Sequence, residues 1–300
     1  MLPHCIAHRI RSGALFAALV AGALPSDASI GIEATPEALA AAMSTRRNVL
    51  LGEVHDNGVQ HALRLEALRR RLEAGARPAI AFEQFDRQQQ ADIERVRREQ
   101  PRNANALIAA AGARNWEWKY YRPFVELALE FDLPIVAANL SRGEAIKVAT
   151  EGWGAIFNAA EQVALGLDRL PAEFISVHER AVARGHCDLL PIDSLPPMAR
   201  AQIARDIVLA RSVLPYFSHG VVLLTGNGHV RKDVGVPYWL NPEQRREVVS
   251  IGLLEADPDG TEGPVDDVRQ RYDAFLATAP AERPDPCEAL RRRPPPSTRP

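Results

Sequence analysis

The sequence predicts an α/β fold in which a mostly parallel β-sheet is flanked by helices and accompanied by a smaller helical subdomain. Short apolar runs of strand length alternate with longer stretches of helical periodicity, as in βαβ units. Four of these runs end in polar side chains, and ligands of parallel sheets sit at the carboxyl ends of the strands. The composition, 46% hydrophobic and 25% charged with a net charge of −2, is typical of a soluble globular protein and gives no electrostatic footprint for nucleic acid.

Six segments have the length and composition of strands: residues 48–54, 78–84, 134–140, 220–226, 247–256 and 272–278. Helical spacing follows the first strand and places four residues on one face: His61, Leu65, Leu68 and Leu72. Residues 87–99 are almost wholly polar, which predicts an exposed helix. A helix to residue 131 is expected after the aromatic stretch 115–124, and residues 196–217 predict a long helix.

The two ends of the chain depart from this pattern. Residues 1–28 predict an export signal, because a mildly basic start precedes an apolar run too short to span a bilayer and a small-residue cleavage site. A buried N-terminal helix is the alternative. No cysteine directly follows the apolar run, so we expect a periplasmic or otherwise exported chain without a lipid anchor. Residues 30–279 form the predicted α/β domain, with a helical lid or subdomain at about 141–195, and residues 280–300 form a Pro/Arg-rich tail.

Export would leave two cysteines in the mature chain, Cys187 and Cys287. Outside the cytoplasm such a pair can close a disulfide. Two unrelated thiols are the alternative, and the sequence does not choose between them.

Polar side chains at the strand ends are the main indication of a functional site. We expect one rim to receive Glu53, His55, Glu83, Asp86, Asn139, Arg142, Asn227, His229 and Arg231. Within this set, His55, Glu83 and His229 could hold a divalent metal, with Glu53 as an alternative carboxylate. The same four residues, Glu53, His55, Glu83 and His229, could instead perform acid–base catalysis without a metal.

Other residues of these motifs have structural interpretations. His61 lies one turn into the predicted helix and is expected on a helix face, and Asp56 or Asn57 fits as the N-cap of that helix. The glycines of GNGH at residues 226–229 predict either a close backbone approach or an ordinary tight turn. GNG lacks the longer glycine pattern of a phosphate-binding loop, so nucleotide binding is not expected.

The aromatic stretch at residues 115–124 can be core or ligand surface. As core it would anchor a helix on the sheet, and as a ligand surface it would offer flat walls and phenol oxygens, since a tyrosinate can be an axial ligand of haem iron. The sequence has no CxxCH motif, which excludes covalent haem attachment by that signature, and no GxSxG or HExxH hydrolase signature.

Several motifs together resemble the ChaN-like haem-binding uptake proteins of the Tiki and erythromycin-esterase-like superfamily. They are LLGEVHDNGVQH (50–61), AFEQFDR (81–87), NWEWKYYRPF (115–124), HC (186–187), AQIARDIVLA (201–210) and LLTGNGHVRKDVGVP (223–237). The resemblance runs from about residue 48 to residue 287. It implies an exported α/β protein of haem and iron acquisition, with haem held at a cleft or between the subunits of a homodimer and delivered through outer-membrane uptake machinery.

The resemblance also implies tyrosine ligation of haem, for which the candidates are Tyr120, Tyr121, Tyr216 and Tyr238. In the wider superfamily, glutamates and histidines serve hydrolysis, and the matching positions here are Glu53, His55, Glu83 and His229. Two functions therefore stand side by side: a haem-binding uptake protein, and a hydrolase that is metal-dependent or uses a Glu/His general base. A scaffold with a decayed site is the third alternative.

Overall fold

The computed structural model describes residues 30–256 and 265–291, so the predicted export signal of residues 1–28 lies outside the described residues. These residues form one seven-stranded sheet in the order β1-β7-β6-β2-β5-β3-β4, with every neighbouring pair parallel. The strands are β1 (Ile30–Gly31), β2 (Asn48–Leu51), β3 (Ala79–Asp86), β4 (Ile135–Asn139), β5 (Val221–Leu224), β6 (Val248–Glu255) and β7 (Ala274–Thr278). The predicted fold class is confirmed, and the six predicted strands are all present. The short edge strand β1 was not predicted.

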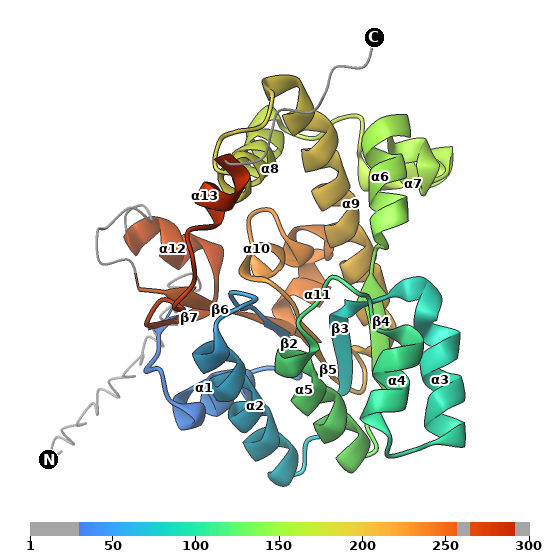
Figure 1. Cartoon of the computed structure of the whole chain (residues 1–300), viewed down its shortest axis with the longest axis vertical. Helices are drawn as coiled ribbons and strands as arrows, with labels where there is room; N and C mark the ends of the chain where they lie inside the picture. Colours follow the sequence, from blue (N-terminus) through green and yellow to red (C-terminus); the bar gives the residue numbers. More distant parts are fainter. Residues whose placement is uncertain (1–29, 257–264, 292–300) are drawn as a thin grey trace, which may run out of the picture.

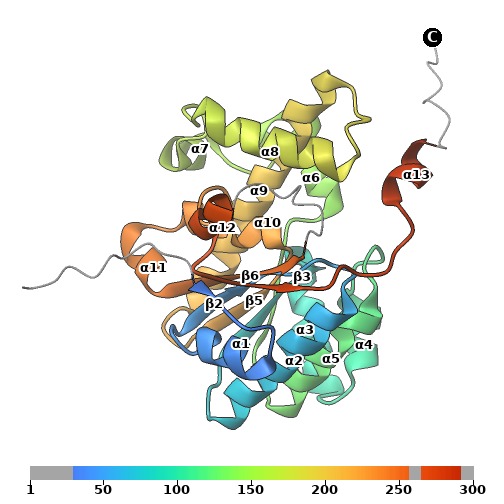
Figure 2. The ribbon, with the colours of Figure 1, turned by 90° about the vertical axis from the view of Figure 1, so that its left-hand side faces the viewer.

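Side chains alternate between the two faces of the sheet, and helices bury each face. One face of the sheet carries Val49, Ile80 and Val222, which belong to one core cluster with residues of five helices, and these helices lie below the sheet in Figure 2. These helices are α1 (Pro36–Met43), α2 (Gly58–Glu73), α3 (Gln90–Glu99), α4 (Ala104–Ala111) and α5 (Trp118–Glu130). A 3₁₀ turn, Arg87–Gln89, leads into α3, so the polar helix predicted at 87–99 is present with Ile93 and Val96 buried.

The opposite face of the sheet carries Leu50, Ala81 and Leu223, which pack mainly against the long helix α9 (Leu195–Val213). A 3₁₀ turn, Leu214–Tyr216, continues α9, in agreement with the long helix predicted at 196–217. The shorter elements on this side are α10 (Asn227–Val230), α11 (Pro242–Arg246), α12 (Val265–Arg271) and the 3₁₀ turn Val236–Trp239.

The region predicted as a helical subdomain consists of helices stacked on α9 (Figures 1 and 2). They are α6 (Arg142–Glu151), α7 (Ala159–Leu165) and α8 (Ala172–Gly185), with 3₁₀ turns at Trp153–Ala155 and Ile192–Ser194. A core of their own, which includes Phe157, Phe174 and Ile203, joins them to α9. Its use as a lid stays a prediction. No helix among the described residues is long and apolar enough to cross a membrane.

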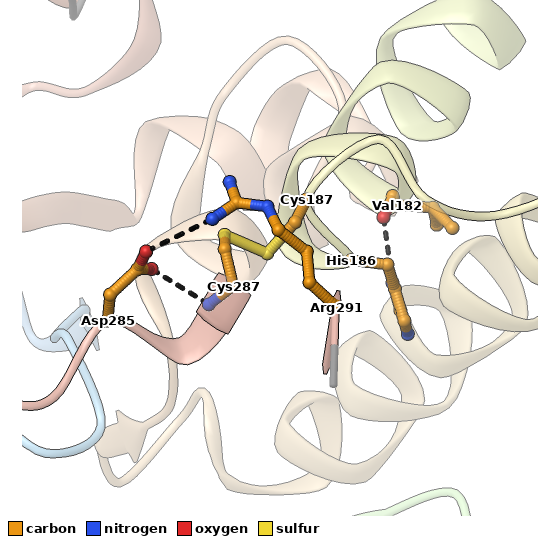
Figure 3. Close-up of a disulfide and its surroundings, with 6 residues drawn as sticks. All are labelled: Val182, His186, Cys187, Asp285, Cys287 and Arg291. Carbon is orange, nitrogen blue, oxygen red and sulfur yellow. Dashed lines mark hydrogen bonds and ion pairs between the residues drawn. A yellow bond between two sulfur atoms is a disulfide. The ribbon is translucent and has the colours of Figure 1, made fainter. Parts of the chain in front are cut away.

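The disulfide between Cys187 and Cys287 is present, so the interpretation as two unrelated thiols was wrong (Figure 3). It ties the end of α8 to α13 (Pro286–Arg291), a short helix within the Pro/Arg-rich tail that the composition did not predict. Between β7 and α13, Arg283 forms ion pairs with Asp56 at 2.8 Å and with Glu255 at 2.5 Å. The C-terminal segment is therefore fixed both to the sheet edge and to the helical region.

Candidate functional site

The alternation of side chains along β2 and β3 places two buried glutamates on opposite faces of the sheet at its carboxyl edge. Glu53 continues the parity of Val49 and Leu51, so it points toward α2 and α5. Glu83 continues the parity of Ala79 and Ala81, so it points toward α9. Both glutamates are 2% exposed, and each therefore needs partners of opposite charge or hydrogen-bond donors.

Glu53 is held by side chains from α2 and α5. The fully buried guanidinium of Arg64 forms an ion pair with its Oε2 atom. Tyr121 donates its hydroxyl to Oε1 at 2.6 Å, and Nδ1 of His61 lies 3.3 Å from Oε2. Burial lowers the pKa of Arg64 to about 10 and the pKa of His61 to about 4. At neutral pH Arg64 is therefore the cation that pairs with the buried Glu53 carboxyl group.

His55 stands above this cluster and uses one ring nitrogen in it. Nδ1 lies 3.0 Å from Oε1 of Glu53, and the side chain is 50% exposed. The ring is wedged between Trp116, with centroids 4.8 Å apart, and Gly226, where an added Cβ would lie 2.8 Å from the imidazole Cε1. Burial lowers the pKa of His55, and the positive charge of His229 adds to this effect. The lowered pKa favours the neutral imidazole of His55, and half of its side-chain surface is exposed.

Glu83 belongs to a second group, which consists of two carboxylates with one imidazole between them. Its Oε2 accepts hydrogen bonds from the Thr225 hydroxyl at 2.6 Å and from the Gly226 amide at 3.0 Å. Its Oε1 lies 3.4 Å from Nε2 of His229, whose Nδ1 lies 2.6 Å from Oδ1 of Asp206 on α9. The His229 ring therefore lies between two buried carboxylates.

This arrangement fixes His229 as an imidazolium. Burial lowers the pKa of His229, but the charges of Asp206 and Glu83 outweigh burial and raise that pKa to about 10. Burial favours the neutral acid of Glu83, but His229 and His55 hold the pKa of that carboxyl well below its usual value. Both ring nitrogens of His229 consequently carry protons that are directed at carboxylates.

The four residues named from the sequence, Glu53, His55, Glu83 and His229, therefore lie at one edge of the sheet in two adjoining groups. The sequence offered two interpretations of the GNGH motif, a close backbone approach or an ordinary tight turn. The structure shows the close approach, since Gly226 packs against the His55 ring and donates its amide to Glu83.

The other rim residues serve the framework of this edge. Asn139 donates to the Glu83 carbonyl at 2.7 Å, and Asn227 exchanges two hydrogen bonds with the backbone of Leu253. Arg231 pairs with Asp233 in the following loop. Asp86 is half-buried at the end of β3, and burial raises its pKa, while Arg142 is exposed on α6.

The structure separates the four tyrosine candidates. Tyr121 is 1% exposed and is committed to Glu53, and burial raises its pKa. Tyr120 is partly exposed at the same edge and stacks on His61 with ring centroids 4.6 Å apart. Tyr216 precedes β5 and so lies at the opposite, amino edge, and Tyr238 packs on Phe174 in the helical region. Only Tyr120 combines exposure with a position beside the glutamate groups.

The residues proposed for a divalent metal do not fit one in this arrangement. No group of three or more His, Cys, Asp or Glu side chains among residues 30–256 and 265–291 is placed to hold a metal ion. His229 has no free lone pair, because both of its nitrogens face carboxylates. Metal binding by His55, Glu83 and His229 therefore stays a prediction without support from the geometry.

Cavities do not add candidates to the site. A cavity of about 1220 Å³ lies at the amino edge of the sheet, where Arg46, Val248 and Ala274 line it, and it contains none of the candidate residues. A second cavity of about 230 Å³ lies behind Asp206, between α8 and α9.

Sequence reasoning missed three members of the site and underestimated a fourth. Arg64 and Asp206 lie inside long helices, where a charged residue predicts a solvated face, and Thr225 lies within the predicted strand 220–226 and was not singled out. His61 was expected on a helix face, but it is 4% exposed and donates from Nε2 to the His55 carbonyl at 2.9 Å. The spacing of His61 and Arg64 after Glu53 could have indicated them, because residues 61 and 64 lie one turn apart on one face of α2. Asn57 is the N-cap of α2, which settles the choice between Asp56 and Asn57.

Fold and site together define an α/β protein with buried acid–imidazole groups at the carboxyl edge of a parallel sheet. The profile of one family, described as "Haem-binding uptake, Tiki superfamily, ChaN", matches residues 39–240. The chain belongs to this family of haem-binding uptake proteins. No protein with a curated description matches the sequence.

One solved structure agrees with this fold. The ChaN protein of Campylobacter jejuni, whose structure is described as showing cofacial haem binding, is similar with 21% identity and a TM-score of 0.61. That likeness covers 79% of this chain and 89% of the Campylobacter chain, and it shows the fold alone. More distant similarity extends to an erythromycin esterase mutant in its open conformation, with 16% identity, a TM-score of 0.40 and coverage of 73% of this chain and 72% of the esterase chain.

Proposed function

We propose that this chain is an exported haem-binding protein of haem or iron uptake, and that it binds haem at the carboxyl edge of the sheet. Membership of the haem-binding uptake family over residues 39–240 is the observation that carries the proposal. The donor set at this edge fits a haem: His55 and Tyr120 are accessible and can coordinate iron, and the Trp116 ring offers a flat apolar wall beside His55. When bound, haem would supply the iron that these donors ligate.

A hemin titration of the purified mature chain tests the proposal. We expect a saturable change in the Soret absorbance that ends near one hemin per chain. Elemental analysis of the same preparation before hemin is added measures resident metal. No spectral change at stoichiometric hemin would refute haem binding.

Export and assembly form part of the same proposal. An intact disulfide between Cys187 and Cys287 supports folding outside the cytoplasm, because such bonds persist in oxidising compartments. A homodimer that encloses haem, and passage of haem through outer-membrane uptake machinery, follow from the family resemblance. Sedimentation of the chain with and without hemin tests the dimer: a mass that stays monomeric on saturation would exclude it.

A second function, Glu/His hydrolysis, is favoured by one specific observation. Nδ1 of His55 lies 3.0 Å from Oε1 of Glu53, which is the arrangement of a general base with its orienting carboxylate. The nearby imidazolium of His229 supplies fixed positive charge. The test is cleavage of a panel of ester and peptide substrates by the wild-type chain and by His55→Ala. A wild-type chain that cleaves none of them would exclude this function for those substrate classes.

A further inference from the structure

The large cavity at the amino edge of the sheet is separate from the glutamate and histidine groups of the carboxyl edge. We propose that this cavity binds an amphipathic anion, a long apolar chain that ends in a carboxylate or a phosphate. Long-chain fatty acids and monoacyl phosphates share this chemistry. The proposal goes beyond haem binding, and it depends on the volume of the cavity, its apolar walls and the unpaired cations that line it.

The cavity lies where the strands of one sheet edge begin. Strand β1 pairs with β7, and β7 pairs with β6, so these three strands lie side by side. Their residues line the cavity together with residues of α1 and α11. The volume of about 1220 Å³ is above the range of about 300–1,000 Å³ that small-molecule sites usually have. A ligand with a long chain therefore has room.

Apolar side chains form much of the lining. Ile30 and Ile32 contribute from β1 and the residues after it, Ala42 from α1, and Val249 and Ala274 from β6 and β7. The Ile30 side chain is 65% exposed. An apolar chain in the cavity would remove this surface from water, which is favourable in proportion to the area covered.

The charges of the lining favour an anion. Four cations but only two carboxylates line the cavity, and one of the carboxylates, Asp273, is paired with Lys232 at 3.2 Å. The second carboxylate, Glu33, is exposed on the segment before α1. No carboxylate among residues 30–256 and 265–291 forms an ion pair with the remaining cations, which are Arg46, Arg245 and Arg246. Such an excess of one charge attracts ligands of the opposite charge.

Backbone carbonyl groups orient two of these guanidinium groups and leave their charge uncompensated. Arg46 donates from Nε to the Arg246 carbonyl at 3.0 Å, and Arg245 donates from Nε to the Leu240 carbonyl at 2.8 Å. The Arg246 side chain has no hydrogen bond or ion pair with the part of the chain that the structure describes. Arginine binds carboxylates and phosphates through parallel N–H bonds, so these side chains suit an oxyanion head group.

The lining also argues against haem as the occupant of this cavity. Haem iron is held in proteins by His, Cys, Met or Tyr side chains. None of these residue types is present among the described residues that line the cavity. The cavity therefore offers an anion site and an apolar surface without a customary iron ligand, which fits an acyl chain better than a haem.

Fluorescence titration of the purified mature chain with cis-parinaric acid, a fluorescent unsaturated fatty acid, tests the proposal. We expect saturable binding near one probe per chain. Palmitate or a monoacyl glycerol phosphate should displace the probe, and the stronger competitor identifies the head group as carboxylate or phosphate. Hexadecylamine has a similar tail with a cationic head and should not displace it.

Three variants locate the site. Arg46→Ala combined with Arg246→Ala should weaken probe binding by at least about tenfold, the effect of losing one charge-assisted hydrogen bond. Ala41→Trp places a large side chain at an exposed position of the lining and should also weaken binding. Arg98→Ala, at an exposed arginine of α3, is the matched control and should leave affinity unchanged. Urea unfolding checks that each variant is folded, and the arginine variants decide the question if Ala41→Trp is not.

The outcomes also separate this site from haem binding. Absence of probe binding, equal displacement by hexadecylamine, or unchanged affinity in the arginine double variant would overturn the proposal. Displacement of the probe by stoichiometric hemin, with hemin affinity lowered in the same double variant, would assign the cavity to haem and overturn it as well. Hemin binding that the double variant leaves unchanged would support two separate sites.

Discussion

The charge state of His229 gives the sharpest prediction, and Asp206→Asn is the perturbation that tests it. The substitution keeps the shape and the acceptor oxygen of the side chain but removes the charge 2.6 Å from Nδ1 of His229. The pKa of His229 in the folded chain, about 10, is raised above the value of 6.5 expected when it is unfolded. Its stabilising effect is therefore fully present below pH 6.5 and is lost as the pH rises through 10.

The magnitude follows from the two pKa values. Between pH 7 and pH 10 the wild-type chain should lose about 3 kcal/mol of unfolding free energy through this one group. Asp206→Asn should be less stable than wild type by about 3 kcal/mol at pH 7, the lower end for a broken buried pair, because Glu83 still faces the ring. At pH 10 the difference should shrink to roughly 1 kcal/mol, which is the order of one hydrogen bond.

Urea unfolding of both chains across this pH range, with the disulfide intact, measures the difference. Comparing the two chains cancels other groups, including Arg64, whose pKa burial lowers to about 10. Histidine Cε1 resonances should show that His229 does not titrate below about pH 9 in the wild-type chain. Titration of His229 near its unperturbed value, or equal loss of stability with pH in both chains, would refute the reasoning.

Three further predictions concern single contacts. Reduction of Cys187–Cys287, which spans 100 residues, should lower the unfolding free energy by about 4 kcal/mol in urea titrations; unchanged midpoints would show that the bridge does not constrain the unfolded chain. Arg64→Met should lower the unfolding free energy by about 3–5 kcal/mol, because it leaves the buried Glu53 without its cation. Adding Glu53→Met should recover much of that loss in the same urea titration. A double variant less stable than Arg64→Met would contradict the pairing. Gly226→Ala should displace the imidazole that its Cβ would approach to 2.8 Å, at a cost of about 1–3 kcal/mol; a crystal structure with an unmoved ring would contradict it.

The fold could be predicted from the sequence because its strands are short, apolar and bounded by polar residues. The segments at 48–54 and 220–226 pair with each other in the core of the sheet, as β2 with β5. The edge strand β1 could not be predicted, because two residues have no periodicity and depend on pairing with β7. The helix in the Pro/Arg-rich tail was missed for a related reason: the disulfide and Arg283 fix this segment, and composition does not report either contact.

The site was predictable where residues follow strands and unpredictable where they come from helices. Glu53 follows β2, and Glu83 lies near the end of β3. The order of the strands in the sheet therefore brings both glutamates to one edge. Arg64 and Asp206 reach that edge from helices whose rotation against the sheet is decided by core packing. Their role as counterions is therefore visible only in three dimensions, although a buried charge requires that some partner of opposite charge exist.

Partner atoms, more than residue type, decide what each histidine at this edge can do. His61 uses its Nε2 atom in a structural hydrogen bond to the His55 carbonyl. His229 is a cation held between two carboxylates. His55 uses only Nδ1 in its contact with Glu53 and keeps the lone pair of its other ring nitrogen. As a proposed haem donor and as a proposed general base, His55 would use that same lone pair. The fold is shared by proteins with different functions and does not choose between them. The half-exposed imidazole of His55 beside Trp116 is the side chain that both proposals share.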